Sequence, residues 1–124
     1  MNIHISNTSG KSLYEQIYAQ IKNQILDGTL KEGEPLPTIR GLAKDLRISV
    51  ITTSRAYSDL ERDGYIYSVV GKGSFVAAKN KETVREEYLK QAESKIEEAI
   101  VLGRTAGLSD EELKEIFLLI LKGD

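Results

Sequence analysis

The sequence predicts a mainly α-helical protein with one small β-hairpin. In five separate stretches, apolar residues recur every three or four positions, which is the periodicity of an amphipathic helix. Two S-x-x-E boxes, beginning at Ser12 and Ser109, mark helix starts. Between the third and fourth stretches, two short runs rich in β-branched and aromatic residues flank Gly71, Lys72 and Gly73, a pattern typical of a hairpin.

The first helix is expected over residues 12–27. Gly28 can adopt the left-handed conformation that ends helices. Residues 28–37 hold both prolines of the chain and two glycines, so we expect an ordered loop there rather than a helix or strand. The inward face of the first helix is an aliphatic stripe with four-residue spacing: Leu13, Ile17, Ile21 and Ile25.

A short second helix and a third helix follow this loop, with a tight turn between them. Thr38 can cap the second helix and Ser49 the third, which ends at Gly64. The two hairpin runs, residues 65–70 and 74–78, come next. Three helices followed by a hairpin, with the short second helix joined closely to the third, form the winged helix-turn-helix arrangement. We assign residues 1–78 to this domain.

Residues 79–124 predict a tail of two further helices. The fourth helix is expected to run to about Leu102, with Gly103 and Gly107 interrupting the pattern after it. The fifth helix is expected over residues 110–122 and has a strong apolar stripe.

The tail is the expected dimerisation segment. Two helices alone cannot usually bury enough apolar surface to remain folded, so another surface must cover their stripes. The first helix of the same chain is one candidate, and a second copy of the tail is the better one. The residues expected at the dimer interface are Tyr88, Ile96, Ile100, Leu113, Ile116, Phe117, Ile120 and Leu121.

Composition excludes several classes of protein. The chain has no cysteine and a single histidine, His4, which argues against disulfides, thiolate zinc sites and metal clusters. No stretch approaches the roughly 20 apolar residues of a membrane span, and the amino terminus lacks an export signal, so a cytoplasmic protein is expected. The spacing of a phosphate-binding loop is absent around Gly71. Adjacent carboxylates at Asp110–Glu112 are explained by the helix dipole, so they give no reason to expect a hydrolase. Neither an enzyme nor a cofactor is predicted.

The charge distribution only weakly favours a nucleic-acid partner. The net charge is −2. Residues 1–78 hold nine Lys or Arg against eight Asp or Glu, whereas residues 79–124 hold eight against eleven. The predicted helix-turn-helix domain is therefore less repulsive to a polyanion than the tail.

Geometry makes the third helix the candidate for reading DNA. A helix about 10–12 Å across fits the major groove of B-DNA, and its amino end can reach base edges. Helix amino ends also attract phosphates, and the glycines of the hairpin allow close approach of the backbone while Lys72 supplies a cation. The DNA-contact candidates are Thr38, Arg40, Lys44, Ser49, Val50, Ile51, Thr52, Ser54, Arg55, Gly71, Lys72 and Gly73.

Each candidate also has a purely structural interpretation. Thr38 and Ser49 could act only as caps, and the basic residues of the second helix could form a solvated face. Arg55 could pair with Asp59 one turn later as an ordinary helix-surface ion pair.

Over residues 12–76, the sequence resembles the DNA-binding domain of the GntR family of bacterial transcription regulators. The most specific segments are G-x-x-LP at 33–37 followed by Arg40, A-Y-x-x-L-E-x-x-G at 56–64, and GKGSFV at 71–76. The resemblance implies that the second and third helices and the wing contact an operator. Many members have arginines at the positions of Val50 and Ser54, so different base contacts are implied here.

The short tail resembles that of the YtrA-like subfamily, whose members commonly repress operons, often encoding ABC transporters. This implies a homodimeric repressor with a palindromic operator of double-stranded DNA, because a two-fold pair places two recognition helices about one DNA turn apart. An effector is not indicated. The alternative is a small-ligand sensor or protein-interaction module on a winged-helix scaffold, which a sizeable pocket between the tail helices would favour.

Overall fold

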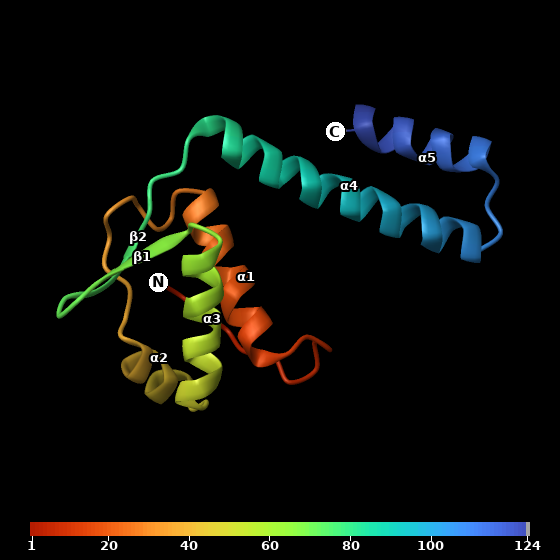
Figure 1. The fold of residues 1–124 in the computed structure, drawn as a ribbon. Coiled ribbons are helices and arrows are strands. Elements are labelled where there is room, and N and C mark those ends of the chain that lie inside the picture. Colours follow the sequence, from red (N-terminus) through yellow and green to blue (C-terminus); the bar gives the residue numbers. More distant parts are fainter. Residues whose placement is uncertain (124) are drawn as a thin grey trace. The chain divides into compact units, whose positions relative to one another are not determined.

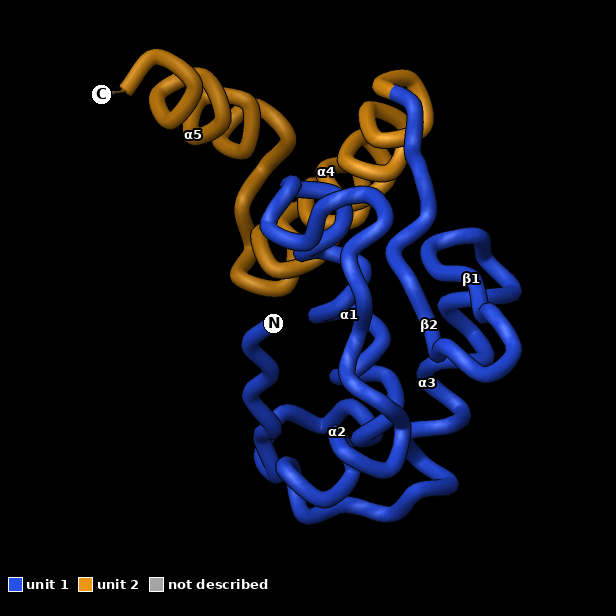
Figure 2. Tube along the Cα trace, turned by 90° about the vertical axis from the view of Figure 1, so that its left-hand side faces the viewer, with its two compact units in different colours: residues 1–80 blue, residues 81–124 orange. Residues whose placement is uncertain are grey.

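The predicted order of five helices and one antiparallel hairpin is confirmed within residues 1–123, the part of the chain that the computed structural model describes. The chain divides into two compact units, Met1–Asn80 and a second unit beginning at Lys81 (Figure 2). The elements are α1 (Leu13–Leu26), α2 (Ile39–Leu46), α3 (Val50–Arg62), β1 (Ile66–Val69), β2 (Gly73–Val76), α4 (Lys81–Thr105) and α5 (Asp110–Lys122) (Figure 1).

Four helices begin at the caps that the sequence predicts. The hydroxyls of Ser12 and Ser109 accept hydrogen bonds from the backbone N–H three residues later. In both boxes the glutamate side chain accepts a hydrogen bond from the backbone N–H of the capping serine. Thr38 Oγ1 accepts from the Gly41 N–H at 3.0 Å, and Ser49 Oγ accepts from the Thr52 N–H at 3.0 Å. Each hydroxyl satisfies a donor that the helix itself leaves unpaired.

The core of the first unit lies where α1 and α2 pack on α3. Ile17 and Ile21 of α1 and Leu60 of α3 are completely buried, as the apolar stripes require. Thr53, also completely buried, donates its hydroxyl to the Ser49 carbonyl at 3.1 Å, so burial leaves no unmet polar group there. The apolar stripe of α1 is therefore part of this core.

The hairpin is joined to the helical body through the loop before α2. Ile66 pairs with Val76 and Val69 with Gly73 in an antiparallel register. The loop lies along the other edge of β2, where Gly33 N donates to Val76 O at 2.8 Å and Leu36 N to Ser74 O at 2.9 Å. The expected ordered loop therefore acts as a short third strand that protects the edge of the hairpin.

An amino-terminal arm lies along α1 and is fixed by three glutamines one helical turn apart. The side chain of Gln16 accepts from Ser6 N and donates to Ser6 O, both at 2.8 Å. Gln20 makes the same pair of bonds to His4, at 2.8 and 2.7 Å, and Gln24 donates to the Asn2 carbonyl at 2.6 Å. The side-chain amides thus replace the neighbouring strand that an extended arm would otherwise need.

The second unit is a pair of helices in which α4 continues beyond its expected end. The prediction that Gly103 interrupts the helix is wrong, since α4 runs to Thr105 and Gly103 is buried inside it. A Cβ at this position would lie 2.3 Å from Leu113 Cδ2, so glycine permits the close approach of α5. Gly107, with φ of +86°, lies in the turn that follows.

Candidate nucleic-acid interface

The amino end of α3 presents its outward side to solvent. Ile51 is 82% exposed and Val50 40% exposed, whereas the opposite side of the helix is buried in the core. The rotation of α3 about its axis is set by its buried residues, Thr53, Ala56, Tyr57 and Leu60. The first turn of α3 is therefore held on a rigid element and faces outward.

A turn centred on Arg47 sets the angle between α2 and α3. Arg47 is the non-glycine residue with positive φ in the described chain, at 58°, and its side chain is exposed. The Ile48 N–H donates to the Ala43 carbonyl at 3.0 Å, which closes the end of α2. The left-handed residue lets the chain reverse within three positions, so that α3 starts immediately after α2.

Positive charge is concentrated at this end of the domain. Residues 38–56 contain four Lys or Arg and one acidic residue, whereas the carboxyl end of α3 has Asp59, Glu61 and Asp63. Arg62 is engaged there by Asp59 at 3.2 Å and by Asp63 at 3.1 Å. Three exposed cations, Arg40, Lys44 and Arg47, make no ion pair within residues 1–123. They are available to a polyanion.

Arg55 is positioned by α1. Its guanidinium lies 3.6 Å from the centre of the Tyr14 ring, and its Nη2 donates to the Tyr14 hydroxyl at 3.0 Å. The alternative that Arg55 pairs with Asp59 is wrong, because the Arg55 guanidinium lies on Tyr14 and no ion pair joins it to Asp59 within residues 1–123. Stacking on an aromatic face restricts the guanidinium while leaving the residue exposed.

The tip of the hairpin is an exposed loop with one cation. Gly71 and Gly73 have φ values of +79° and +108°, which side-chain-bearing residues rarely adopt. The Lys72 N–H donates to the Val69 carbonyl at 2.9 Å and closes the turn. Beside it, Val70 is fully exposed. The wing is also braced from α3, since Ser68 Oγ donates to a carboxylate oxygen of Glu61 at 2.5 Å.

Two tyrosine hydroxyls connect α3 to the rest of the unit. Tyr57, almost fully buried, donates to the Pro37 carbonyl at 2.7 Å and thereby ties α3 to the loop before α2; burial raises the pKa of its hydroxyl. Tyr18 of α1 donates to Asp63 at 2.5 Å. Hydrogen bonds from Arg62 and then from Tyr18 lower the pKa of the Asp63 carboxyl.

The structure brings the twelve DNA-contact candidates onto α2, the amino half of α3 and the hairpin tip. Thr52 and Ser54 are half-buried, and the hydroxyls of Thr38 and Ser49 serve as caps. Sequence reasoning missed Arg47, Val70 and Tyr14. A basic residue in the predicted inter-helix turn was a usable signal for Arg47, and the hairpin-tip position was one for Val70. Nothing in the sequence signalled the contact of Tyr14 with Arg55, 41 residues away.

The apolar residues expected at a dimer interface remain largely uncovered in the single chain. No residue of α5 is buried, and the exposed fractions of Ile116, Phe117, Ile120 and Leu121 range from 42% to 75%. Between α4 and α5 lies an apolar groove of about 460 Å³, to which Ile96, Ile100 and Leu113 also contribute. Tyr88, in the amino-terminal half of α4, is 43% exposed.

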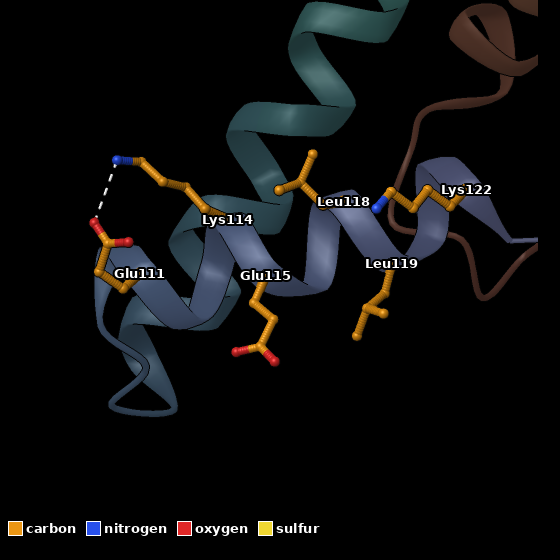
Figure 3. A pocket seen from close by; sticks show the side chains of 6 residues that line it. All are labelled: Glu111, Lys114, Glu115, Leu118, Leu119 and Lys122. Carbon is orange, nitrogen blue, oxygen red and sulfur yellow. Dashed lines mark hydrogen bonds and ion pairs between the residues drawn. The ribbon is translucent and has the colours of Figure 1, made fainter.

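Two exposed leucines also lie among the charged residues on the outer side of α5. Figure 3 shows Leu118 and Leu119 projecting from opposite sides of the helix beside the Lys114–Glu111 pair, whose charged atoms are 3.4 Å apart. A helix with apolar residues on several sides is typical of a buried position in a larger helical assembly.

Within residues 1–123 there is no group of three or more His, Asp or Glu side chains that could bind a metal ion. None of the helices described is long and apolar enough to cross a lipid bilayer.

Comparison with known proteins gives consistent matches. Residues 13–76 match the family model described as bacterial regulatory proteins, gntR family. The transcriptional repressor YtrA of Bacillus subtilis is 34% identical over 113 residues, which cover 91% of this chain and 87% of YtrA. These relatives are transcription regulators and not enzymes.

Solved structures agree over both units and over the DNA-binding unit alone. A transcriptional regulator from Oenococcus oeni aligns with a TM-score of 0.76 and 26% identity, covering 94% of this chain and 97% of that one. The DNA-binding domain of AraR, solved in complex with operator ORE1, aligns with a TM-score of 0.52 and 28% identity, covering 62% of this chain and 94% of that one.

Proposed function

The chain belongs to the GntR family of bacterial transcription regulators, and from this premise we propose that it is a homodimeric repressor that binds a palindromic DNA operator and silences an operon. Operons that encode transporters are the first targets to examine. The proposal places the protein in the cytoplasm, where its operator would lie.

The observation that carries the DNA-binding part is the outward first turn of α3 surrounded by uncommitted cations. A helix of about 10–12 Å fits a major groove about 12 Å wide. In that position Val50, Ile51, Thr52 and Ser54 face base edges, and Arg55 lies behind them on α3.

The cations around α3 would anchor the protein on the phosphates. Arg40, Lys44 and Arg47 lie on α2 and in the turn after it, and Lys72 lies at the wing tip. Phosphate contacts fix the register of a protein on the duplex, whereas base contacts supply specificity. The capped amino ends of α2 and α3, at Thr38 and Ser49, can add backbone N–H groups to this anchoring.

The dimer is inferred from the uncovered apolar surface of the tail. A unit of two helices whose largest side chains stay about half exposed does not bury enough apolar area to offset the entropy of folding. A second tail offers the same stripes and can cover them in a two-fold interface. The groove lined by Ile100, Leu113 and Phe117 is the expected centre of that interface.

Dimerisation would also compensate for the modest charge of each chain. Residues 1–78 have only one more basic than acidic residue, so that a single domain binds phosphate weakly. Two domains on one duplex gain avidity because the second binding event becomes intramolecular. A palindromic operator follows from the two-fold symmetry of the protein.

Selection of duplexes from a random-sequence pool with the full chain tests the proposal. We expect an enriched inverted repeat, two chains per duplex by sedimentation, and affinity that falls as salt rises. Phe117→Glu should give monomers and weaken binding at least about tenfold, whereas Ser94→Glu, which adds the same charge at an exposed polar position of α4, should do neither. Failure to enrich any sequence, or binding as a single chain, would refute the proposal.

A second candidate function, a small-ligand sensor, has one observation in its favour. The apolar groove between α4 and α5 is large enough for a drug-sized molecule. A thermal-shift screen with apolar metabolites on the dimer separates the two functions: stabilisation by one of them supports a sensor, and a groove closed by the second tail gives no shift.

A further inference from the structure

The first turn of α3 shows apolar rather than polar chemistry to solvent. Ile51 is the most exposed side chain of this turn, at 82%, and its neighbour Val50 is 40% exposed. A single exposed aliphatic residue is ordinary on a protein surface. Here the position matters, because the residue lies at the helix end that the proposed function places against base edges.

The polar groups beside Ile51 are largely committed within the chain. Ser49 Oγ donates to Thr52 Oγ1 at 2.8 Å, and Thr53 Oγ1 donates to the Ser49 carbonyl at 3.1 Å. Of the hydroxyls from Ser49 to Ser54, only those of Thr52 and Ser54 donate no hydrogen bond within residues 1–123. Arg55, the basic residue of this helix half, is bonded to Tyr14. Hydrogen-bond readout by the first turn is therefore limited.

The surroundings of Ile51 favour a polyanion over an apolar protein partner. Three basic residues of α2 and of the turn after it precede Ile51 in the sequence: Arg40, Lys44 and Arg47. They are exposed and form no ion pair within the part of the chain that the structure describes. An apolar protein surface placed there would bury these charges at a considerable desolvation cost. A DNA groove instead provides phosphates on both sides of its base edges.

We propose that Ile51 reads a thymine by packing on its 5-methyl group in the major groove, with Val50 extending the contact. The thymine methyl is the apolar group that this groove displays, and aliphatic or methyl-bearing side chains recognise it by direct contact. This inference rests on the proposed function, since it names the base feature that the same surface selects.

Replacing thymine by deoxyuridine tests this contact because it removes only the methyl group. A duplex selected by the full chain from a random pool is synthesised with deoxyuridine at each thymine of a half-site in turn. For the wild-type protein, one such replacement should weaken binding about fourfold, the effect of losing one buried methyl-sized group. Ile51→Ala should bind the thymine duplex several-fold more weakly and show no further loss with deoxyuridine there.

The Ile51→Ala substitution should not destabilise the fold, since Ile51 is exposed and alanine is the better helix former. Val101→Ala, which shortens another exposed β-branched residue on α4, should retain the full fourfold ratio between the two duplexes. If no duplex is enriched, the proposed function fails. If a duplex is enriched but deoxyuridine is neutral at every thymine, or if Ile51→Ala keeps the fourfold ratio, the thymine contact is refuted while the proposed function stands.

Discussion

The salt dependence of operator binding should report both the phosphate contacts and the number of chains on the DNA. Each chain has four exposed cations on this surface whose side chains make neither an ion pair nor a hydrogen bond among residues 1–123: Arg40, Lys44, Arg47 and Lys72. Two chains then offer eight, and a slope of about −0.9 per phosphate contact gives a log–log slope near −7. Raising salt from 50 to 200 mM should weaken binding about 10⁴-fold.

Lys72→Ala removes one cation from each wing and leaves the turn closed by backbone. In a dimer the slope should become less steep by about 1.8, so that the same salt increase weakens binding about tenfold less than in the wild type. A single bound chain would give a change of only about 0.9. Fluorescence anisotropy titrations at four or more salt concentrations measure the slope.

The matched control is Lys95→Ala, which removes an exposed lysine of α4 that is 3.6 Å from Glu98. Its slope should equal that of the wild type. If Lys72→Ala leaves the slope unchanged, or if Lys95→Ala changes it equally, the assignment of the wing tip to phosphate contact is wrong.

Three further predictions concern stability. Tyr57→Phe removes the bond to the Pro37 carbonyl and should lower the free energy of unfolding by about 1–2 kcal/mol, measured by urea denaturation; an unchanged midpoint would contradict the role of this bond. Arg47→Gly relieves the left-handed backbone strain and should raise stability by up to about 1 kcal/mol while weakening operator binding, so a lower Tm would refute it. The Ser12 hydroxyl and backbone hold the pKa of Glu15 below its ordinary 4.5, so its stabilising contribution is present above that pH and lost as pH falls through the lowered pKa. The urea midpoint of the wild type should therefore drop more steeply from pH 6 to pH 3 than that of Glu15→Gln; parallel curves would count against this.

The elements that could be predicted from sequence are those specified by local chemistry. Ser12, Thr38, Ser49 and Ser109 cap helices because a hydroxyl needs only the N–H groups two or three residues later. The hairpin followed from glycines at positions 71 and 73, whose positive φ is a property of the turn itself. The exposure of the amino end of α3 followed from the apolar spacing on the opposite side of that helix.

The features that could not be predicted depend on contacts between different elements of the fold. Arg55 had a plausible partner four residues away, and only the packing of α1 on α3 brings it to Tyr14. Gly103 looked like a helix breaker because its packing against Leu113 is invisible in sequence. The pairing of the 33–36 loop with β2 likewise joins segments about 40 residues apart. Local rules describe propensities, whereas these contacts are set by the tertiary fold.

The glutamines of α1 that bind the amino-terminal arm make that arm tolerant of sequence change. The side chains of Gln16 and Gln20 form hydrogen bonds with the backbone N–H and C=O groups of Ser6 and His4, and not with their side chains. Most residues could occupy positions 4 and 6, but proline lacks the N–H that is gripped. The two glutamines themselves are less replaceable, because a glutamate carboxylate at position 16 or 20 can accept a hydrogen bond and cannot donate one. The position of this arm is thus determined by the side chains of α1 and not by those of the arm itself.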